Sequence, residues 1–452
     1  MAGIGFDLRR LVSEDGSMLG RLRAYVAAGM ISAGPWVVTM MTLLLVRYVA
    51  GWMPDQMVEG FLSIVGWTFA ASLISVGGVQ MAATRYLADA LYSGDYRALL
   101  PSFATCMIVV AAIQTMTGLG LCLWLGFEPR LTLAVLLLYV AISLSWLAMA
   151  WLTVIRQHDK VLFVYLCGAL VFLVLLRMTD ANAQLSDLIL AYAMGNLVVV
   201  ALMSLMILRG VEAPGPRSGE VLRGIWRHRV LFFVGTAYGL SLWSDKWVFW
   251  LLEGLATGEG LRHHPLYDTC FYMGYLTVVP AMSINLVDFE TSFYERYRAY
   301  FAAVTGNRPL REIRAHGIEM QVTLRQAGLR LLRLQGAITV LCLMLAEPLV
   351  ELVGLPPFAA RVFRFVCLGA FCHVLLLISM LVLLYFDRRH AALRVVFTFL
   401  LGNTLLAWWS QRVGPQTYGL GFAIAAWIAL FCALIEVRAT FARLEYLTFM
   451  RR

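Results

Sequence analysis

The stretch LTLAVLLLYVAISLSWLAMAWLTVI, residues 131–155, decides the fold class of this chain. It contains no Asp, Glu, Lys or Arg, and a helix of about 20 such apolar residues crosses the hydrocarbon core of a bilayer. Similar runs precede and follow it along the 452 residues. We therefore expect an all-α polytopic membrane protein with about 12 transmembrane helices. The expected spans lie near 24–46, 58–80, 101–126, 131–155, 160–176, 187–208, 230–252, 269–288, 334–353, 364–386, 391–411 and 416–437.

The composition agrees with this interpretation. Hydrophobic residues make up 61% of the chain and charged residues 14%, whereas a soluble domain has about 25% charged residues. The formal net charge is +9, but the basic residues stand beside the apolar runs, where they set orientation and meet anionic headgroups. We therefore expect membrane lipids, and not nucleic acid, as partners of these charges.

The distribution of basic residues predicts the orientation in the membrane. If alternate intervals lie on opposite sides, the side that holds both termini has 28 Lys and Arg residues and the other side has seven. Because basic residues accumulate on the cytoplasmic side, we expect both termini in the cytoplasm.

The even number of spans suggests a duplicated unit of six helices. We expect an N-terminal six-helix bundle with an amphipathic N-terminal helix at residues 1–208, and a C-terminal six-helix bundle at 209–452. Basic amphipathic stretches precede both the first and the seventh span, as surface helices would. The longest cytoplasmic interval, 289–333, is broken by GNRP at 306–309, so we expect two helices there.

Several classes of enzyme are excluded by what the chain lacks. It contains no GxxxxGK[ST] loop and only two lysines, Lys160 and Lys246, so it has no P-loop ATPase. No interval between spans is long enough for a nucleotide-sugar domain of a glycan polymerase. We therefore expect a transporter or a scaffold rather than an enzyme, with no catalytic residues, no metal and no cofactor.

The polar residues of the seventh span are the leading candidates for a transport cavity. Charged residues inside a span cost roughly 2.5–3.5 kcal/mol on insertion scales, so Asp245 and Lys246 are expected to face a partner or water. Adjacent helical residues point about 100° apart, which predicts a separate partner for each. Tyr238, Ser241 and Asp245 share a helical face and could line the path. Alternatively, Asp245 pairs with an arginine of a neighbouring span, and Lys246 reaches the outer headgroups.

Two further acidic residues, Asp288 and Glu290, stand near the cytoplasmic end of the eighth span. They could meet substrate in the cavity, or they could pair with Arg296, Arg298 or Arg325. Other polar residues within the spans are expected to form hydrogen bonds between helices rather than to bind ligands. These residues are Gln114, Asn196, Asn285, His373 and Asn403.

Gly34 and Pro35 interrupt the first span and are a candidate helix hinge, because proline removes one backbone hydrogen bond. Gly235 and Gly239 could give the seventh span a comparable soft point. Tyr238, Trp243, Tyr272 and Tyr275 could stack on sugar rings.

Four short motifs carry a resemblance to a known family. They are MAGIGFDLRRL at 1–11, ISAGPW at 31–36, WSDKWVFW at 243–250 and DFETSFYERYRAYF at 288–301. In order and spacing the chain resembles the PelG family of bacterial Pel exopolysaccharide systems, within the superfamily of lipid-oligosaccharide flippases and multidrug exporters. The resemblance runs from end to end of the chain.

The resemblance implies a protein of the bacterial inner membrane with two six-helix bundles around a central cavity. Such a protein would move a polysaccharide rich in N-acetylgalactosamine to the periplasm while a cytoplasmic PelF-like glycosyltransferase extends it. PelD-like and PelE-like membrane proteins would be its partners. By analogy, Arg296, Arg298, Arg311 and Arg314 form a candidate docking surface for the glycosyltransferase.

Two other functions remain open from the sequence. The chain could be an ion-coupled exporter of small amphipathic compounds, with Asp245 carrying the proton or sodium ion. It could also be a scaffold that anchors the synthase without transporting anything, in which case Asp245 and Lys246 would be structural.

Overall fold

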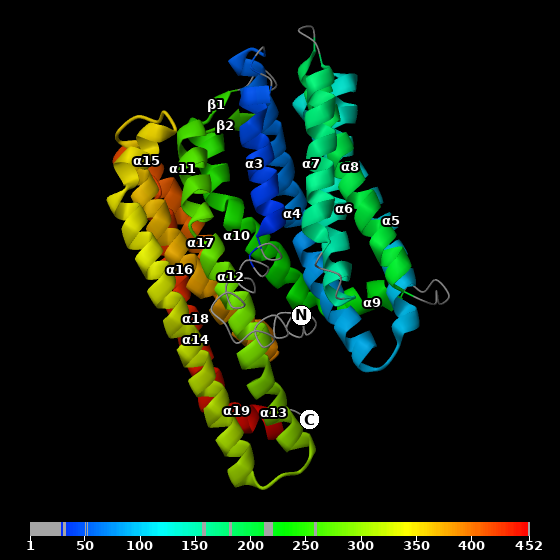
Figure 1. Cartoon of the computed structure of the whole chain (residues 1–452), viewed down its shortest axis with the longest axis vertical. Coiled ribbons are helices and arrows are strands. Elements are labelled where there is room, and N and C mark those ends of the chain that lie inside the picture. The colour runs from blue at the N-terminus through cyan, green and yellow to red at the C-terminus, as the bar shows by residue number, and fades with distance from the viewer. Residues whose placement is uncertain are drawn as a thin grey trace, which may run out of the picture. The chain divides into compact units, whose positions relative to one another are not determined.

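The computed structural model describes residues 29, 33–49, 51, 53–155, 160–179, 183–211, 220–256 and 260–450 (Figure 1). The side chains of residues 47, 48, 285, 286 and 290 are not described. Contacts divide the chain into two compact units. One unit is Gly34–His264, here called the 34–264 unit, and the other is Pro265–Arg452 with the described part of Met1–Ala33, here called the 265–452 unit.

The 34–264 unit is built from long helices and one very short hairpin. Its elements are α3 Gly34–Val49, α4 Asp55–Tyr92, the 3-10 turn Tyr96–Ala98, α5 Leu99–Leu125, α6 Pro129–Val154, α7 Val161–Met178, α8 Leu185–Gly210, α9 Glu220–Arg227 and α10 Arg229–Glu253. Strands β1 Leu255–Ala256 and β2 Arg262–His263 pair antiparallel, with Leu255 opposite His263.

The 265–452 unit is also helical. Its elements are α11 Pro265–Leu276, α12 Val279–Asp288, a π-helical turn Phe289–Phe293, α13 Tyr294–Thr305, α14 Leu310–Met344, α15 Ala346–Leu352, α16 Ala359–Tyr385, α17 Arg389–Val413, the 3-10 turn Pro415–Thr417, α18 Leu420–Ala442 and α19 Leu444–Phe449. Helix α16 is its most buried span and packs against α11, α14 and α18.

Nine helices of the described residues are long and apolar enough to cross a membrane. They correspond to nine of the twelve spans expected from the sequence. The other three depart from a long apolar helix for visible reasons. Residues 24–28 and 30–32 of the first expected span are not described, and its described part contains α3 from Gly34. Helix α10 carries Asp245 and Lys246, and the expected span 269–288 is divided into α11 and α12 at Thr277 and Val278.

The interval expected at 289–333 differs in one respect from the prediction. The break at GNRP is confirmed, because α13 ends at Thr305 and α14 begins at Leu310. However, α14 does not end before the membrane. It continues as one helix to Met344, so a single rod contains both the surface helix and most of the ninth span.

The predicted bundle boundary at residues 208 and 209 differs from the division by contacts, which falls after His264. Helices α9 and α10 pack on α4 and therefore group with the preceding residues. The proposed duplication of a six-helix unit, at 1–208 and 209–452, stays a prediction.

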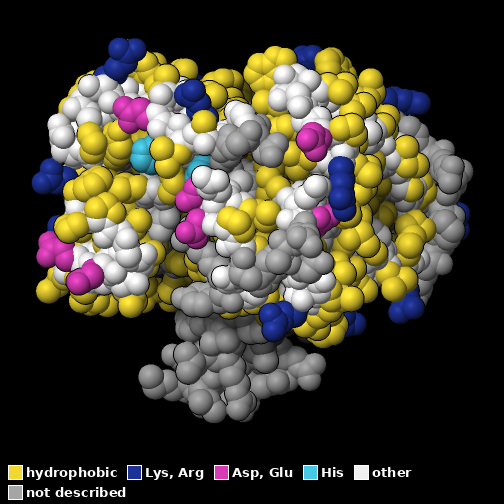
Figure 2. All heavy atoms as spheres, turned by 90° about the horizontal axis from the view of Figure 1, so that it is seen from above, with side chains coloured by type: hydrophobic (Ala, Val, Ile, Leu, Met, Phe, Trp, Pro, Cys, Tyr) yellow, Lys and Arg dark blue, Asp and Glu magenta, His cyan; other side chains and the backbone are white. Residues whose placement is uncertain are grey.

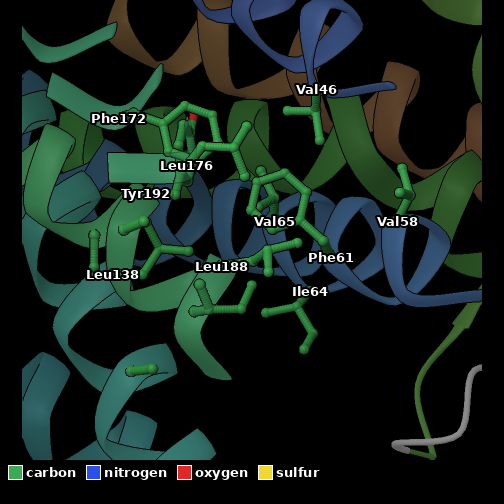
Figure 3. Close-up of a cluster of buried hydrophobic side chains, with 14 of the residues drawn as sticks. Val46, Val58, Phe61, Ile64, Val65, Leu138, Phe172, Leu176, Leu188 and Tyr192 are labelled. Carbon is green, nitrogen blue, oxygen red and sulfur yellow. The ribbon is translucent and has the colours of Figure 1, made fainter. Parts of the chain in front are cut away.

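The cores of the two units are apolar and aromatic. One cluster of the 34–264 unit joins α4, α6, α7 and α8, with Phe61 stacked on Phe172 and Tyr192 edge-on to both (Figure 3). In the 265–452 unit, a cluster joins α13, α14 and α16 around Phe293, Tyr300 and Met320. Large apolar side chains such as Trp124 and Leu405 are exposed, as expected of surfaces that face lipid. Figure 2 shows hydrophobic side chains over much of the face in view.

Candidate functional site

Helix α10 holds the predicted charge pair, and glycines allow it to lie directly on α4. A Cβ atom added at Gly235 would stand 2.3 Å from the carbonyl oxygen of Gly77, and one added at Gly78 would stand 2.7 Å from the carbonyl oxygen of Phe232. Small residues permit this close approach of backbones in membrane helices. The helix is continuous from Arg229 to Glu253. Gly235 and Gly239 therefore allow close packing of α10 on α4. The soft point predicted for the seventh span does not appear as a break in the helix.

Asp245 and Lys246 are paired with each other. Lys246 Nζ donates to Asp245 Oδ1 at 3.0 Å and to Oδ2 at 3.2 Å, and it also donates to the carbonyl oxygen of Leu242 at 3.0 Å. The exposed fraction of the residue is 0% for Asp245 and 2% for Lys246. The prediction that these neighbours could not pair is wrong, because the lysine chain is long enough to fold back along the helix. The alternative that Lys246 reaches the headgroups is also wrong.

Aromatic rings surround this pair along α10. The ammonium of Lys246 lies 5.8 Å from the ring centre of Trp243, within the range of a cation–π contact. Trp67 of α4 stacks on Trp247 and contacts Trp250. The charge pair is thus fixed by its own helix and by a tryptophan cluster that joins α4 to α10.

The expected polar stripe is buried in the described structure. Ser241 is fully buried and donates to the carbonyl oxygen of Tyr238 at 2.7 Å, while Tyr238 is half-buried. These two residues and Asp245 share a face of α10, as the sequence predicts. Whether this face lines a transport path stays a prediction.

Asp288, at the end of α12, forms a two-point ion pair. Arg330 Nε and Nη2 each lie 3.0 Å from one of the carboxylate oxygens of Asp288. The prediction that Asp288 pairs with Arg296, Arg298 or Arg325 is therefore wrong. The continuous α14 brings Arg330 to this level instead. The side chain of Glu290 lies outside the described atoms, as does that of Asn285.

The four predicted docking arginines differ in their surroundings. Arg296 pairs with Glu319 at 2.9 Å, and Arg314 pairs with Glu445 of α19 at 2.8 Å. Arg298 and Arg311 are exposed and have no ion-pair partner among the described residues. A partner protein would thus meet two available guanidinium groups and two that are engaged within the chain.

Gly34 and Pro35, the predicted hinge, stand at the start of α3, and residues 30–32 before them are not described. A Cβ atom at Gly34 would lie 2.9 Å from Leu162 Cδ1 of α7. The boundary between the two compact units falls between Ala33 and Gly34. The hinge stays a prediction.

Several polar contacts between helices agree with the sequence interpretation. His373 Nδ1 lies 2.9 Å from the hydroxyl oxygen of Tyr275, which joins α16 to α11, and Gln114 donates to Ser75 at 2.9 Å, which joins α5 to α4. Asn196 instead donates within its own helix, to the carbonyl oxygen of Tyr192. Tyr275 is engaged with His373 and stacked on Phe271.

The sequence did not identify two cavities of the 34–264 unit. A small one, of about 20 Å³, is lined by Thr39 and Thr42 of α3, Tyr165 of α7 and Asn196 of α8, among others, and has room for one water molecule. A larger one, of about 570 Å³, lies between α4, α5, α6 and the end of α10. Their lining residues come from helices far apart in sequence and include no carboxylate, so no local motif marks them.

Solved structures share this arrangement of helices. An outward-facing multidrug resistance MATE family transporter of the MOP superfamily matches with a TM-score of 0.65 at 14% identity, covering 99% of both chains. A MOP superfamily transporter from Pyrococcus furiosus, described as having a binding pocket of reverse polarity, matches with a TM-score of 0.63 at 13% identity over 98% of this chain and 99% of that chain. A MATE structure in a bent conformation matches with a TM-score of 0.63 at 14% identity, over 98% of each. At these identities the likeness shows the fold.

The chain is thus an all-α polytopic membrane protein with the twelve-helix fold of MOP superfamily transporters. No curated protein sequence matches it. A family model described as "PelG: Putative exopolysaccharide Exporter (EPS-E)" matches residues 1–449, and the chain belongs to this family. Family and fold together indicate a membrane transporter rather than an enzyme.

Proposed function

We propose that this transporter moves a growing, Pel-like polysaccharide rich in N-acetylgalactosamine from the cytoplasm to the periplasm across the bacterial inner membrane. The observation that carries the proposal is the match to the exopolysaccharide exporter family over residues 1–449. The MOP fold supports it, because that fold belongs to transporters. Both termini lie in the cytoplasm in this proposal, as the bias of basic residues favours.

The electrostatics of α10 suit an uncharged, hydroxyl-rich substrate. Asp245 and Lys246 neutralise each other at 3.0 Å, so the pair adds no net charge that would hold a polymer tightly. Tyr238, Ser241 and the tryptophans near the pair supply hydroxyl groups and ring faces. A sliding polymer needs contacts of this kind, because weak, repeated binding allows it both to enter and to leave. Asp288 and Glu290 would meet the substrate near the cytoplasmic end of the path.

The proposal includes partners. A PelF-like glycosyltransferase would deliver the polymer, and PelD-like and PelE-like membrane proteins would complete the assembly. Arg298 and Arg311 are the best placed of the four candidate docking residues, since their guanidinium groups are exposed and have no ion-pair partner among the described residues. Arg296 and Arg314 would contribute less, because each already pairs with a glutamate.

An export assay in cells tests the proposal. A strain without this chain, but with the glycosyltransferase, should retain polymer inside the cell, and the wild-type chain should restore polymer outside. A variant with Asp245→Asn and Lys246→Met together keeps the site neutral but removes both of its charged groups. We expect normal membrane levels of this variant and loss of most export. Unchanged export would contradict a role of this pair in transport.

A second candidate function is export of small amphipathic compounds driven by an ion gradient. The multidrug transporters that share the fold favour it. Asp245 would then be the ion carrier, although the ammonium of Lys246 already neutralises its carboxylate. Purified chain in liposomes that moves such compounds against a gradient, and loses this activity with Asp245→Asn, would favour this function over polysaccharide export.

The third alternative is a scaffold that anchors the synthase without transport. It is favoured by the complete burial of Asp245 and Lys246, which is also what a structural pair requires. Normal export by a variant with Asp245→Ala and Lys246→Ala, together with loss of synthase recruitment when the whole chain is absent, would support it.

A further inference from the structure

The larger cavity of the 34–264 unit has the form of a lipid site. Helix α6 packs against both α4 and α5, while α4 and α5 contact each other little. Gln114 Nε2 of α5 bonds to Ser75 Oγ of α4 at 2.9 Å, and Tyr139 of α6 lies within 3.3 Å of the same oxygen. Beyond this polar contact the cavity of about 570 Å³ occupies the space between the helices. Its volume is within the range of roughly 300–1,000 Å³ for small-molecule sites.

The walls of the cavity are mainly apolar. Ile64 and Ala71 of α4, Leu121 and Leu125 of α5 and Val135 of α6 face it. Along α5 it extends from Thr117 to Leu125, a depth of roughly 12 Å at the rise of a helix. A hydrocarbon chain fits such walls, whereas a sugar would leave most of its hydroxyl groups without hydrogen-bond partners.

The side of the cavity that α5 forms is open toward the outside of the helix bundle. Trp124 has an exposed fraction of 81% and Leu121 one of 46%, and both line the cavity. Since α5 is a membrane-spanning helix, these exposed apolar side chains meet lipid. A lipid chain can therefore enter sideways from the bilayer.

The mouth of the cavity carries a cationic group at the end of the helices. Arg262 of β2 lines the cavity, is exposed, and has no acidic partner among the described residues. Its backbone is held in place, because Trp67 Nε1 donates to the carbonyl oxygen of Arg262 at 2.8 Å. Its Nη1 also donates to the carbonyl oxygen of Leu251 at 3.3 Å. The guanidinium group is thus positioned beside an apolar slot, and its other N–H groups remain for an anion.

A buried hydrogen-bond acceptor stands on α5 close to the cavity, outside the residues that line it. Gln114 is 2% exposed, and its Oε1 has no hydrogen-bond partner among the described residues. It lies one helical turn from Gly118, which lines the cavity and where a Cβ atom would stand 2.8 Å from the ring of Tyr139. A buried acceptor of this kind leaves room for a further hydrogen-bond donor, such as water.

We infer that this cavity binds one acyl chain of an anionic phospholipid, with the phosphate of that lipid on Arg262. A guanidinium group pairs well with phosphate oxygens, and the apolar slot takes the hydrocarbon chain. The lipid would fill the space between α4 and α5 and would join these helices to α6. This inference concerns a site within the 34–264 unit and does not depend on which substrate the protein transports.

Native mass spectrometry of the purified full chain tests the inference. Delipidated protein is mixed with phosphatidylglycerol or with phosphatidylcholine of the same acyl chains. We expect one retained phosphatidylglycerol, bound about tenfold more tightly than phosphatidylcholine, because the choline cation of phosphatidylcholine opposes the attraction between its phosphate and the guanidinium group of Arg262. Arg262→Ala should remove the preference. The control Arg130→Ala should leave it unchanged, because Arg130 pairs with Asp187 and does not line the cavity.

Filling the cavity provides the second arm of the test. Thr117→Trp, at an exposed position of α5, should abolish retention of the lipid, and Ala71→Phe should act in the same way. Leu401→Trp, on an exposed face of α17, is the matched control and should not change retention. Equal retention of the two lipids by the wild-type chain, or retention unchanged by both filling variants, would overturn the inference.

Discussion

Lys246 Nζ lies 3.0 Å from the carboxylate of Asp245, the residue directly before it on α10, and both side chains are buried. Neighbouring residues of a helix point in different directions, so the contact depends on the lysine chain folding back over the turn that precedes it. The same ammonium reaches the carbonyl oxygen of Leu242. The motif WSDKWVFW therefore contains both members of an ion pair. Helix α10 can thus pass through apolar surroundings without an isolated charge.

The first prediction concerns this pair. Asp245→Asn or Lys246→Met alone leaves one buried charge without its partner, and each should destabilise the protein by about 3–5 kcal/mol. The double variant removes both charges and should be close to the wild-type protein in stability. Thermal unfolding of the detergent-solubilised chain, followed by size-exclusion chromatography, measures the difference. Single variants as stable as the double variant would show that the two charges are not coupled.

The packing of α10 on α4 leads to the second prediction. Gly235→Ala places a Cβ atom 2.3 Å from the carbonyl oxygen of Gly77, so the helices must move apart, at a cost of roughly 1–3 kcal/mol. Gly120→Ala on α5 is the matched control, because its added Cβ atom meets nothing within 4 Å. The melting temperatures of the two variants should differ clearly, with Gly120→Ala at or above the wild-type value. Equal melting temperatures of Gly235→Ala and Gly120→Ala would contradict this packing of α10 on α4.

A third prediction tests the contact between α11 and α16. Tyr275→Phe removes the hydroxyl group that lies 2.9 Å from His373 Nδ1 and should destabilise the protein by about 1 kcal/mol. Tyr446→Phe, at a position that is 62% exposed, should have no measurable effect. Unfolding curves of the two variants, recorded in the same detergent, provide the comparison. A larger loss of stability for Tyr446→Phe than for Tyr275→Phe would contradict the structure.

The fourth prediction concerns the C-terminal helix and its dependence on pH. The hydrogen bond from Arg314 lowers the pKa of Glu445 below its ordinary value of 4.5. The folded state therefore favours the ionised carboxylate, and the stabilisation of α19 is fully present above that ordinary value. It is lost as the pH falls through the lowered pKa, when Glu445 becomes protonated.

Hydrogen exchange of the residues of α19 measures this effect. Protection should be constant from neutral pH down to the ordinary pKa of glutamate and should decrease below it. Glu445→Gln should weaken protection at neutral pH and remove the dependence on pH. The salt bridge is exposed, so the change should stay within α19, and loss of protection across the whole 265–452 unit would speak against this assignment.

The sequence predicts the membrane-spanning helices well, because a long apolar run has few alternatives to a helix in lipid. The spans at 131–155 and 187–208 coincide closely with α6 and α8. The spans that differ are those where local sequence is ambiguous. The span expected at 269–288 is one of them: Pro280 has no backbone N–H and its ring crowds the carbonyl group of Leu276, so α11 ends at Leu276 and α12 begins at Val279.

The candidate site was harder to predict. Asp245 and Lys246 stand out by composition, but their mutual ion pair depends on a rotamer that no sequence pattern specifies. Arg330 pairs with Asp288 because α14 is continuous, and no sequence pattern indicates that the surface helix and the span form one helix. The apolar cavity beneath Arg262 is formed by residues of five segments that meet only in the folded chain.

Translocation of polymer across a membrane tests the central claim most directly. Inverted inner-membrane vesicles that contain this chain are supplied with the PelF-like glycosyltransferase and radiolabelled UDP-N-acetylgalactosamine. We expect labelled polymer within the vesicle lumen, protected from an added glycosidase, and no protected polymer in vesicles that lack the chain. Equal protection in the two kinds of vesicle, or polymer that remains fully accessible in both, would contradict the account.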